Sequence, residues 1–312
     1  MPGPENSIQV VGLGQASFDY LGYLPCYPTE DSKAELSDLR AGCGGPVATA
    51  LAALCRFGVK TSFIGTVGDD LFGKEIIRFL KDESVDVSLL ETMPGYTSQL
   101  AFIAVSPNGS RTVFWHPGTV PPPEPSAIDL SPFRRARVLH LDGLKIEASI
   151  EAARQAKSMG MVVVMDAGTY REKTGQLLPL VDILIASERF ADPLVGPGAP
   201  KSKAIEALLS FGAGQVVITL GAKGSIGFAG TGIIEQPAFP ITVVDTTGAG
   251  DVYHGAYIYR FLEGSDMAEC MKFASAAAAL KCSISGNLRG LPNLEQVLDL
   301  IQGYSGCGVK EI

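Results

Sequence analysis

The nine residues Val243-Val244-Asp245-Thr246-Thr247-Gly248-Ala249-Gly250-Asp251 say most about the fold of this 312-residue chain. We expect a short β-branched strand that enters a glycine turn, followed by an apolar helix over 252–262. Glycines let another group approach the backbone closely, and the first amide groups of a helix point outward with a partial positive charge. The stretch is therefore predicted to hold an anion, with Asp251 beside it as a proton acceptor.

A simpler interpretation is that Asp245 and Asp251 only cap a turn and a helix, as aspartates often do. A cap needs neither two glycines nor a double threonine, so the complete stretch favours phosphoryl transfer. That chemistry depends mainly on positioning and charge stabilisation, and a carboxylate of ordinary basicity suffices as the base.

The rest of the chain alternates short apolar runs with helical patterns, which predicts a doubly wound α/β fold with a mainly parallel sheet. The expected strands are 8–14, 61–66, 138–141, 162–166, 183–186 and 216–220, and further helices are expected at 47–57, 73–81, 147–159, 204–211 and 267–282. Two stretches break the alternation, 20–43 and 97–117, the second resembling a hairpin that turns at Pro107-Asn108-Gly109. We expect one domain over 1–312, with these two stretches forming a small β-sheet lid.

Composition excludes several classes of protein. The net charge of -8 and the pI near 5.0 argue against nucleic acid and anionic membranes as partners. The first six residues lack a secretory signal pattern, and no run reaches the roughly 18 apolar residues of a membrane helix, so a cytoplasmic location is expected. Six cysteines without a C-x-x-C pair predict reduced thiols, and three well-separated histidines argue against a zinc centre.

The stretch 245–251 resembles the C-terminal motif of the ribokinase or PfkB family of carbohydrate kinases. Two more stretches resemble family motifs in the expected order: 44–58, which begins Gly44-Gly45-Pro46-Val47-Ala48-Thr49, and Gly65-Thr66-Val67-Gly68-Asp69-Asp70-Leu71-Phe72-Gly73. The resemblance covers nearly the whole chain. It implies a parallel core with a small β lid, a sugar held between the two, and a homodimer formed through the lid.

The resemblance also implies roles for individual residues. Asp251 matches the catalytic base, and Gly248, Ala249 and Gly250 match the anion hole. ATP and Mg²⁺ are the implied cofactors. Positions that match the nucleotide site are Ser187, Thr219, Gly221, Lys223, Gly224, Thr246 and Ser275, although 219–224 also fits an ordinary turn and the alanine neighbours of Ser275 fit an ordinary core.

The resemblance likewise implies which residues bind the substrate and a cation. The implied sugar-binding residues are Asp19, Asp31, Gly44, Gly45, Thr49 and Asp142, of which Asp31 resembles a lid residue of the ketohexokinase branch but equally fits a solvated loop. Asp245 and Thr247, with carbonyls near Lys281, Ile284, Gly286 and Gly290, match a monovalent-cation site. The resemblance leaves K⁺ activation open.

The sequence departs from the family pattern at two places. Thr49 stands where an asparagine usually follows the paired glycines. The family's Asn-x-x-Glu motif falls near Ser187-Glu188-Arg189-Phe190, where its asparagine is serine and its glutamate is phenylalanine. Glu188 is the acidic residue left to substitute as a contact to magnesium.

Other functions remain to be weighed against a sugar kinase. A nucleoside or sugar-phosphate kinase of the same family stays open, as does a non-catalytic binding protein that kept a kinase fold. The run Gly12-Leu13-Gly14-Gln15-Ala16-Ser17 partly resembles a dinucleotide-binding turn, but the prolines that follow argue against the helix that such a site requires.

Overall fold

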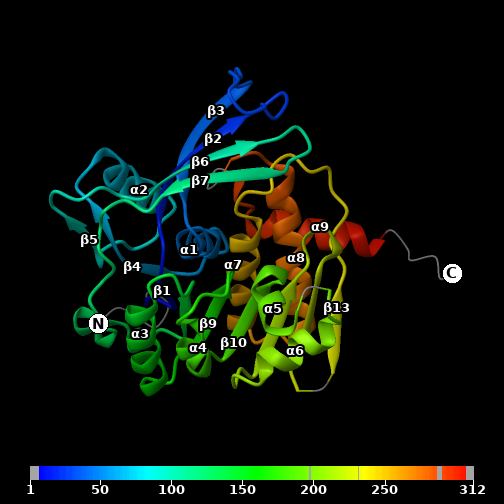
Figure 1. Ribbon diagram of the computed structural model, residues 1–312. Helices are drawn as coiled ribbons and strands as arrows, with labels where there is room; N and C mark the ends of the chain where they lie inside the picture. The colour runs from blue at the N-terminus through cyan, green and yellow to red at the C-terminus, as the bar shows by residue number, and fades with distance from the viewer. Residues whose placement is uncertain (1–6, 197, 231, 287–289, 307–312) are drawn as a thin grey trace.

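The computed structural model describes residues 7–196, 198–230, 232–286 and 290–306 (Figure 1). Within these ranges a large sheet has nine strands in the order β13-β12-β11-β10-β9-β8-β1-β4-β5. Its parallel strands are β1 (Val10–Leu13), β4 (Thr61–Gly68), β5 (Leu90–Met93), β8 (Val138–Leu141), β9 (Val162–Ala167), β10 (Ile183–Ser187) and β11 (Gln215–Thr219), and β12 (Ser225–Phe228) and β13 (Ile233–Gln236) extend one edge in antiparallel fashion. The mainly parallel sheet is as predicted.

Helices cover both faces of the large sheet. One face packs against α1 (Pro46–Arg56), α2 (Leu71–Asp82), α7 (Ala249–Leu262), α8 (Met267–Ser283) and α9 (Leu294–Gly306). The other packs against α3 (Ile146–Ser158), α4 (Thr174–Leu177), α5 (Glu188–Val195) and α6 (Lys201–Leu209). Neighbouring residues of one strand divide between the two cores, for example Val10 and Val11, because side chains alternate along a strand. Both faces are therefore buried.

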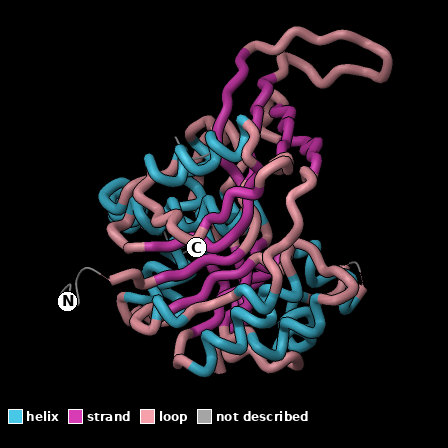
Figure 2. The backbone as a smooth tube through the Cα atoms, turned by 90° about the vertical axis from the view of Figure 1, so that its left-hand side faces the viewer, coloured by secondary structure: helices cyan, strands magenta, loops and turns pink. Residues whose placement is uncertain are grey.

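A second sheet stands off the large one, as Figure 2 shows. Its strand order is β3-β2-β6-β7, built from β2 (Ser17–Tyr23), β3 (Asp38–Gly44), β6 (Leu100–Val105) and β7 (Arg111–His116). Val105 pairs with Arg111, so the chain turns through Pro107-Asn108-Gly109 as expected. The two stretches that broke the strand-helix alternation supply most of this small sheet.

One expected element is absent from the described chain: Val243 to Asp245 does not form a strand. The backbone amides of Val244 and Asp245 donate instead to the carbonyl of Cys282 at the end of α8, at 2.8 and 3.1 Å. Val243 and Val244 are 42% and 43% exposed. The β-branched pair therefore lies in an irregular segment that α8 holds in place.

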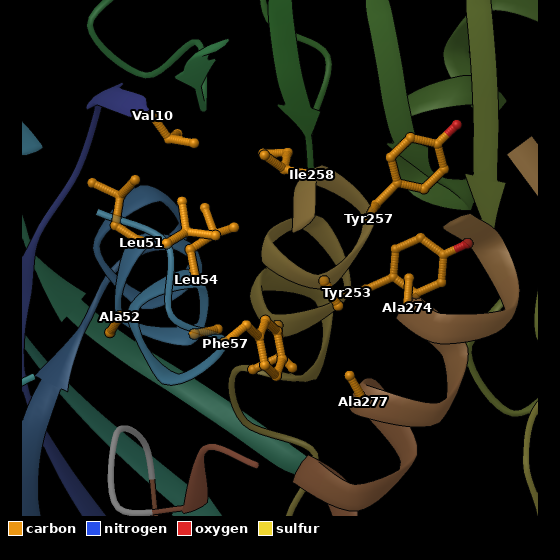
Figure 3. Close-up of a cluster of buried hydrophobic side chains, with 14 of the residues drawn as sticks. Val10, Leu51, Ala52, Leu54, Phe57, Tyr253, Tyr257, Ile258, Ala274 and Ala277 are labelled. Carbon is orange, nitrogen blue, oxygen red and sulfur yellow. The ribbon is translucent and has the colours of Figure 1, made fainter. Parts of the chain in front are cut away.

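The packing of α1 against α7 fixes the position of the glycine turn. Leu51 and Leu54 of α1 point toward α7 within one hydrophobic core, while Tyr253 of α7 lies on the other side of that helix, beside Ala274 of α8 (Figure 3). A Cβ on Gly255 would lie 2.6 Å from the carbonyl oxygen of Ala50, so only glycine permits this close approach of the two helices. The N-terminal ends of both helices are thereby held rigidly beside each other.

Three other expectations concern membrane helices, the state of the cysteines and the N-terminal residues. No helix in the described ranges is long and apolar enough to cross a bilayer. Five cysteines are described and all five are free thiols, at 26, 43, 55, 270 and 282. Cys307 and the N-terminal residues 1–6 lie outside the described residues.

Candidate active site

Candidate residues gather where the parallel strands end. Ser187 and Thr219, the last residues of β10 and β11, are direct register partners. Asp142 follows the last residue of β8, on the same edge of the sheet. In doubly wound sheets this edge, at the carboxyl ends of the strands, is where ligands bind.

The glycine turn opens toward this edge. Gly248 is the N-cap residue of α7 and has a left-handed φ of 77°, which favours glycine. Within the described part of the chain, no side chain caps the first amide groups of α7, and a Cβ built on Gly250 would meet no atom within 4 Å. The turn therefore presents uncapped amides and free space, as an anion hole requires.

Asp251 lies in the first turn of α7 and is partly buried. Burial raises the pKa of its carboxyl, against the attraction of His254, Arg111 and Lys281. Burial also raises the pKa of Asp142 to about 6, and the charge of Asp251 adds to that rise. The two carboxylates therefore share one poorly hydrated region, where Asp251 is a better proton acceptor than a free aspartate.

His254 ties the first turn of α7 to the sheet. Its Nδ1 lies 2.7 Å from the carbonyl oxygen of Gly250 and 3.4 Å from a carboxylate oxygen of Asp166, and its Nε2 lies 3.2 Å from the carbonyl oxygen of Ile185. Each carbonyl oxygen can accept a hydrogen bond from the ring nitrogen that faces it. Burial raises the pKa of the Asp166 carboxyl beside the ring, and the neighbouring His254 acts to lower it.

Asp245 holds the other end of the glycine turn. Its two carboxylate oxygens accept hydrogen bonds from the amide of Thr247 at 2.8 Å, the amide of Gly286 at 3.1 Å and the hydroxyl of Tyr23 at 3.1 Å. Burial alone would raise the pKa of Asp245, but hydrogen bonds from Thr247 and Gly286 and the charge of Lys281 lower it overall. Asp245 is therefore a charged structural anchor.

The small sheet reaches the same turn. Arg111 of β7 donates through Nη1 to the carbonyl oxygen and the hydroxyl oxygen of Thr246, at 2.9 and 2.8 Å. The Thr246 hydroxyl donates to the carbonyl of Gly109, at the tip of the β6–β7 hairpin, at 3.1 Å. Thr246, predicted to bind nucleotide, is thus engaged by the small sheet.

The predicted sugar residues form a connected group, with one exception. Asp19 on β2 is buried and accepts a hydrogen bond from the Ser17 hydroxyl at 2.7 Å. A Cβ on Gly45 would lie 2.3 Å from the carbonyl oxygen of Gln15, whose amide donates to Asp142 at 2.7 Å. Asp31 is instead exposed on the loop between β2 and β3, with a φ of 57°.

Two further predicted positions complete this contact chain. Gly44 ends β3 opposite Ser17. Thr49 is buried on α1, and its Cγ2 lies 3.6 Å from the position of a Cβ on Gly248. The methyl group of Thr49 therefore borders the glycine turn, where an asparagine would have offered a polar group.

Apart from Ser187 and Thr246, the predicted nucleotide residues lie on β11, in the turn after it and on α8. Gly221 and Gly224 have positive φ values of 60° and 92° in the turn after β11, which also contains Lys223. A Cβ on Gly224 would stand only 2.0 Å from the carbonyl oxygen of Gln236, so this turn requires glycine. The buried hydroxyl of Ser275 donates to the carbonyl of Pro237 at 3.2 Å.

The altered Asn-x-x-Glu region, Ser187 to Phe190, forms the start of helix α5. Ser187 is the N-cap of α5 and accepts from the amide of Phe190 at 3.2 Å. Phe190 is buried against Tyr170, so the position of the family glutamate belongs to the core. Glu188 pairs with Lys201 at 2.5 Å. Among the described residues no group of three or more His, Cys, Asp or Glu is arranged to hold a metal by itself.

The residues predicted for a monovalent cation do come together. The amide of Ile284 donates to the carbonyl of Lys281, and the carbonyl of Ile284 faces Gly290. Gly286 bonds to Asp245 as described above. Lys281 was predicted to be near a contributing carbonyl, but its whole side chain is also buried among these residues.

Several site residues lay beyond the reach of sequence reasoning. His254 stands three residues after Asp251, so both lie on one face of α7, and this spacing was the available signal. Tyr23 and Arg111 come from a different sheet, and no local pattern links them to Asp245 or Thr246. Asp166, which lies beside His254, has the sequence context of an ordinary strand residue.

Comparison with known proteins agrees with this geometry. The model of the pfkB family carbohydrate kinase matches residues 8–294. A nucleoside kinase of Methanothermobacter thermautotrophicus is 25% identical, with 91% of this chain and 92% of that protein covered. A ribokinase of Haemophilus influenzae is 27% identical, with 93% and 97% covered.

A solved structure, the Arabidopsis thaliana ribokinase complexed with ribose and ATP, superposes with a TM-score of 0.83 at 28% identity, covering 95% of this chain and 99% of that one. With a family model that spans most of its length, the chain belongs to the pfkB family of carbohydrate kinases.

Proposed function

We propose that the protein transfers the γ-phosphoryl group of ATP to a hydroxyl group of a small sugar, with Asp251 as the general base. The observation that carries this proposal is the position of Asp251 in the first turn of α7, beside uncapped amides and open space. Burial raises the pKa of Asp251, so its carboxylate is a stronger acceptor for the hydroxyl proton.

The transfer step follows from these residues. The substrate hydroxyl oxygen bonds to the γ-phosphorus of ATP while the bond from that phosphorus to the β-γ bridging oxygen breaks and ADP leaves. The hydroxyl proton passes to the Asp251 carboxylate. The amides of Gly248, Ala249 and Gly250 stabilise the charge on the transferring oxygens.

Substrate binding is assigned to the contact chain that ends at the glycine turn. Asp19 and Asp142 accept hydrogen bonds from sugar hydroxyls, and Gly44 and Gly45 let the sugar approach the backbone. Asp31 would reach the sugar only if the loop between β2 and β3 folds over the site. The turn after β11 and Ser275 bind ATP in this scheme.

Magnesium fits this chain as an ion carried by ATP. Mg²⁺ keeps several waters and needs only one or two carboxylates besides phosphate oxygens. Glu188, 46% exposed at the start of α5, is the acidic side chain that would hold it, directly or through water. When bound, the ion neutralises charge on the phosphates.

The small sheet supports a homodimer. Asp19 lies opposite Ala101, so alternate residues place Leu39, Phe102 and Phe114 on the other face of the sheet. These side chains are 54%, 36% and 55% exposed. An exposed apolar face of this kind suits a second copy of the chain. Phe114→Glu should give a monomer in sedimentation if the dimer forms here.

A second candidate substrate is a nucleoside, which is favoured by the similarity to a nucleoside kinase. Because the phosphoryl donor is ATP, a cytoplasmic location belongs to this proposal as well.

Measurement of ADP release with ATP and Mg²⁺ across ketoses, aldoses, nucleosides and sugar phosphates separates the possible substrate classes. Turnover of one class identifies it, whereas ligand binding without any turnover would point to a non-catalytic binding protein.

A further inference from the structure

Lys281 is an unusual residue to find in the core. Its side chain, on the last turns of α8, is fully buried, with 0% exposure. Its Nζ has no hydrogen-bond partner among the described residues. An ammonium group has three donors, and burial without hydrogen-bond partners strongly disfavours its charged form. A buried cation with free donors therefore calls for an electrostatic explanation.

The lysine stem runs between the two loops that frame the glycine turn. Its Cε lies 3.6 Å from the position of a Cβ on Gly248 and 3.5 Å from that of a Cβ on Gly290. The hydroxyl of Thr247, in the same turn, is buried beside the carboxylate of Asp245. The end of the Lys281 stem therefore lies beside Gly248 of the glycine turn.

Carboxylates from two segments balance the charge of Lys281. Burial lowers the pKa of its ammonium, while Asp245 and Asp251 favour the charged form and Arg111 disfavours it. The charge of Lys281 in turn acts to lower the pKa of both Asp245 and Asp251. The group therefore has a charge partner on either side of the glycine turn.

The same loops were predicted to hold a monovalent cation. A second positive ion there would be repelled by the ammonium, because like charges in a buried region are poorly screened by solvent and salt. The stem of Lys281 also fills space between Gly248 and Gly290. The residues present therefore do not fit a separate K⁺ ion.

We propose that the Lys281 ammonium is a built-in monovalent cation that holds the Asp245 loop and the anion hole in their working arrangement, so that the enzyme needs no K⁺. Lys281 is a positioning residue in this account, since it acts through the loop and not on the substrate. The expected effect on turnover rests on the proposed kinase function. The expected binding of a cation by a variant in which Lys281 is replaced does not rest on it.

Two variants separate the charge of Lys281 from its bulk. Lys281→Ala removes the charge and opens space for an ion, whereas Lys281→Met removes the charge and keeps most of the stem. The unmodified protein and both variants are compared in KCl, NaCl and choline chloride at equal ionic strength. Thermal melting is measured without substrates, and ADP release is measured with them.

We expect the unmodified protein to melt at one temperature and turn over at one rate in all three salts. Both variants should lose about 10- to 100-fold in kcat, the range typical of residues that orient a site from outside it. K⁺ should restore activity to Lys281→Ala and raise its melting temperature, because a ligand that binds only the folded state stabilises it. K⁺ should do neither for Lys281→Met.

Other results would overturn the proposal. K⁺ activation or stabilisation of the unmodified protein would show a separate cation site. Full activity in Lys281→Met would show that only the bulk of the side chain matters. If Lys281→Ala fails to fold, folding that returns with K⁺ supports the proposal, and unfolding that K⁺ does not reverse contradicts it. Melting data alone decide the cation question if no substrate is turned over.

Discussion

The Nδ1 atom of His254 lies 2.7 Å from the carbonyl oxygen of Gly250, inside the turn that carries Asp251. With its Nε2 facing the carbonyl of Ile185 and Asp166 nearby, His254 links the start of α7 to β9 and β10. The orientation of the glycine turn thus depends on the contacts of this buried side chain.

We predict that His254→Leu lowers the free energy of unfolding by about 1–3 kcal/mol for each acceptor left without a donor. Asp166→Asn should also destabilise the fold, because it replaces the buried carboxyl that lies 3.4 Å from the Nδ1 atom of His254. In denaturant unfolding, the double variant should lose less than the sum of the two single variants, by about 0.5–3 kcal/mol. Simple additivity would show that the two side chains are not coupled.

Arg111 connects the small sheet to the glycine turn through Thr246. We predict that Arg111→Met lowers kcat/KM by about tenfold or more, since a hydrogen bond from a charged group contributes about 1.5–3 kcal/mol. Arg111→Lys should recover part of the loss. Arg78→Met, an exposed substitution on α2, is the matched control. Equal behaviour of Arg111→Met and Arg78→Met would mean that the contact has no role in turnover.

Asp142 gives a prediction about stability and pH. Its pKa is raised from an unfolded value of about 3.8 to about 6, mainly by burial. Between these values the folded state binds the extra proton, so the contribution of Asp142 to stability falls as pH rises from about 4 to about 6. Asp142→Asn lacks this titration.

The stability advantage of the unmodified protein over Asp142→Asn should therefore shrink by about 2–3 kcal/mol from pH 4 to pH 7. Urea unfolding at several pH values measures this difference, and titrations common to both proteins cancel. A difference that stays constant would mean an ordinary pKa, and one that grows with pH would mean a lowered pKa.

Strand and helix positions in the core could be predicted because each local pattern agrees with the fold. The expected strand 138–141 coincides with β8, and the expected helix 267–282 differs from α8 by one residue. The strand expected at Val243 and Val244 was wrong because β-branched propensity was overridden by tertiary contacts, in which the end of α8 takes up the backbone amides.

The site residues also divide into those with a local sequence signal and those without one. The turn at 248–251 has a local signal, since glycines and helix starts bind anions by backbone geometry. The contacts of Tyr23 and Arg111 depend on how the small sheet docks, over separations of 222 and 135 residues. The burial of the Lys281 ammonium could not be predicted either, because burial of a lysine is decided by packing and not by its neighbours in sequence.

The central claim is that the carboxylate of Asp251 accepts the proton of the attacking hydroxyl. The most direct test compares kcat for Asp251→Asn with that of the unmodified protein, on whichever substrate is turned over, and checks ATP binding by calorimetry. The account predicts a fall in kcat of about 10²–10⁴-fold or more, with ATP affinity changed only a few-fold. An Asp251→Asn variant that keeps its kcat within a few-fold of the unmodified protein would contradict it.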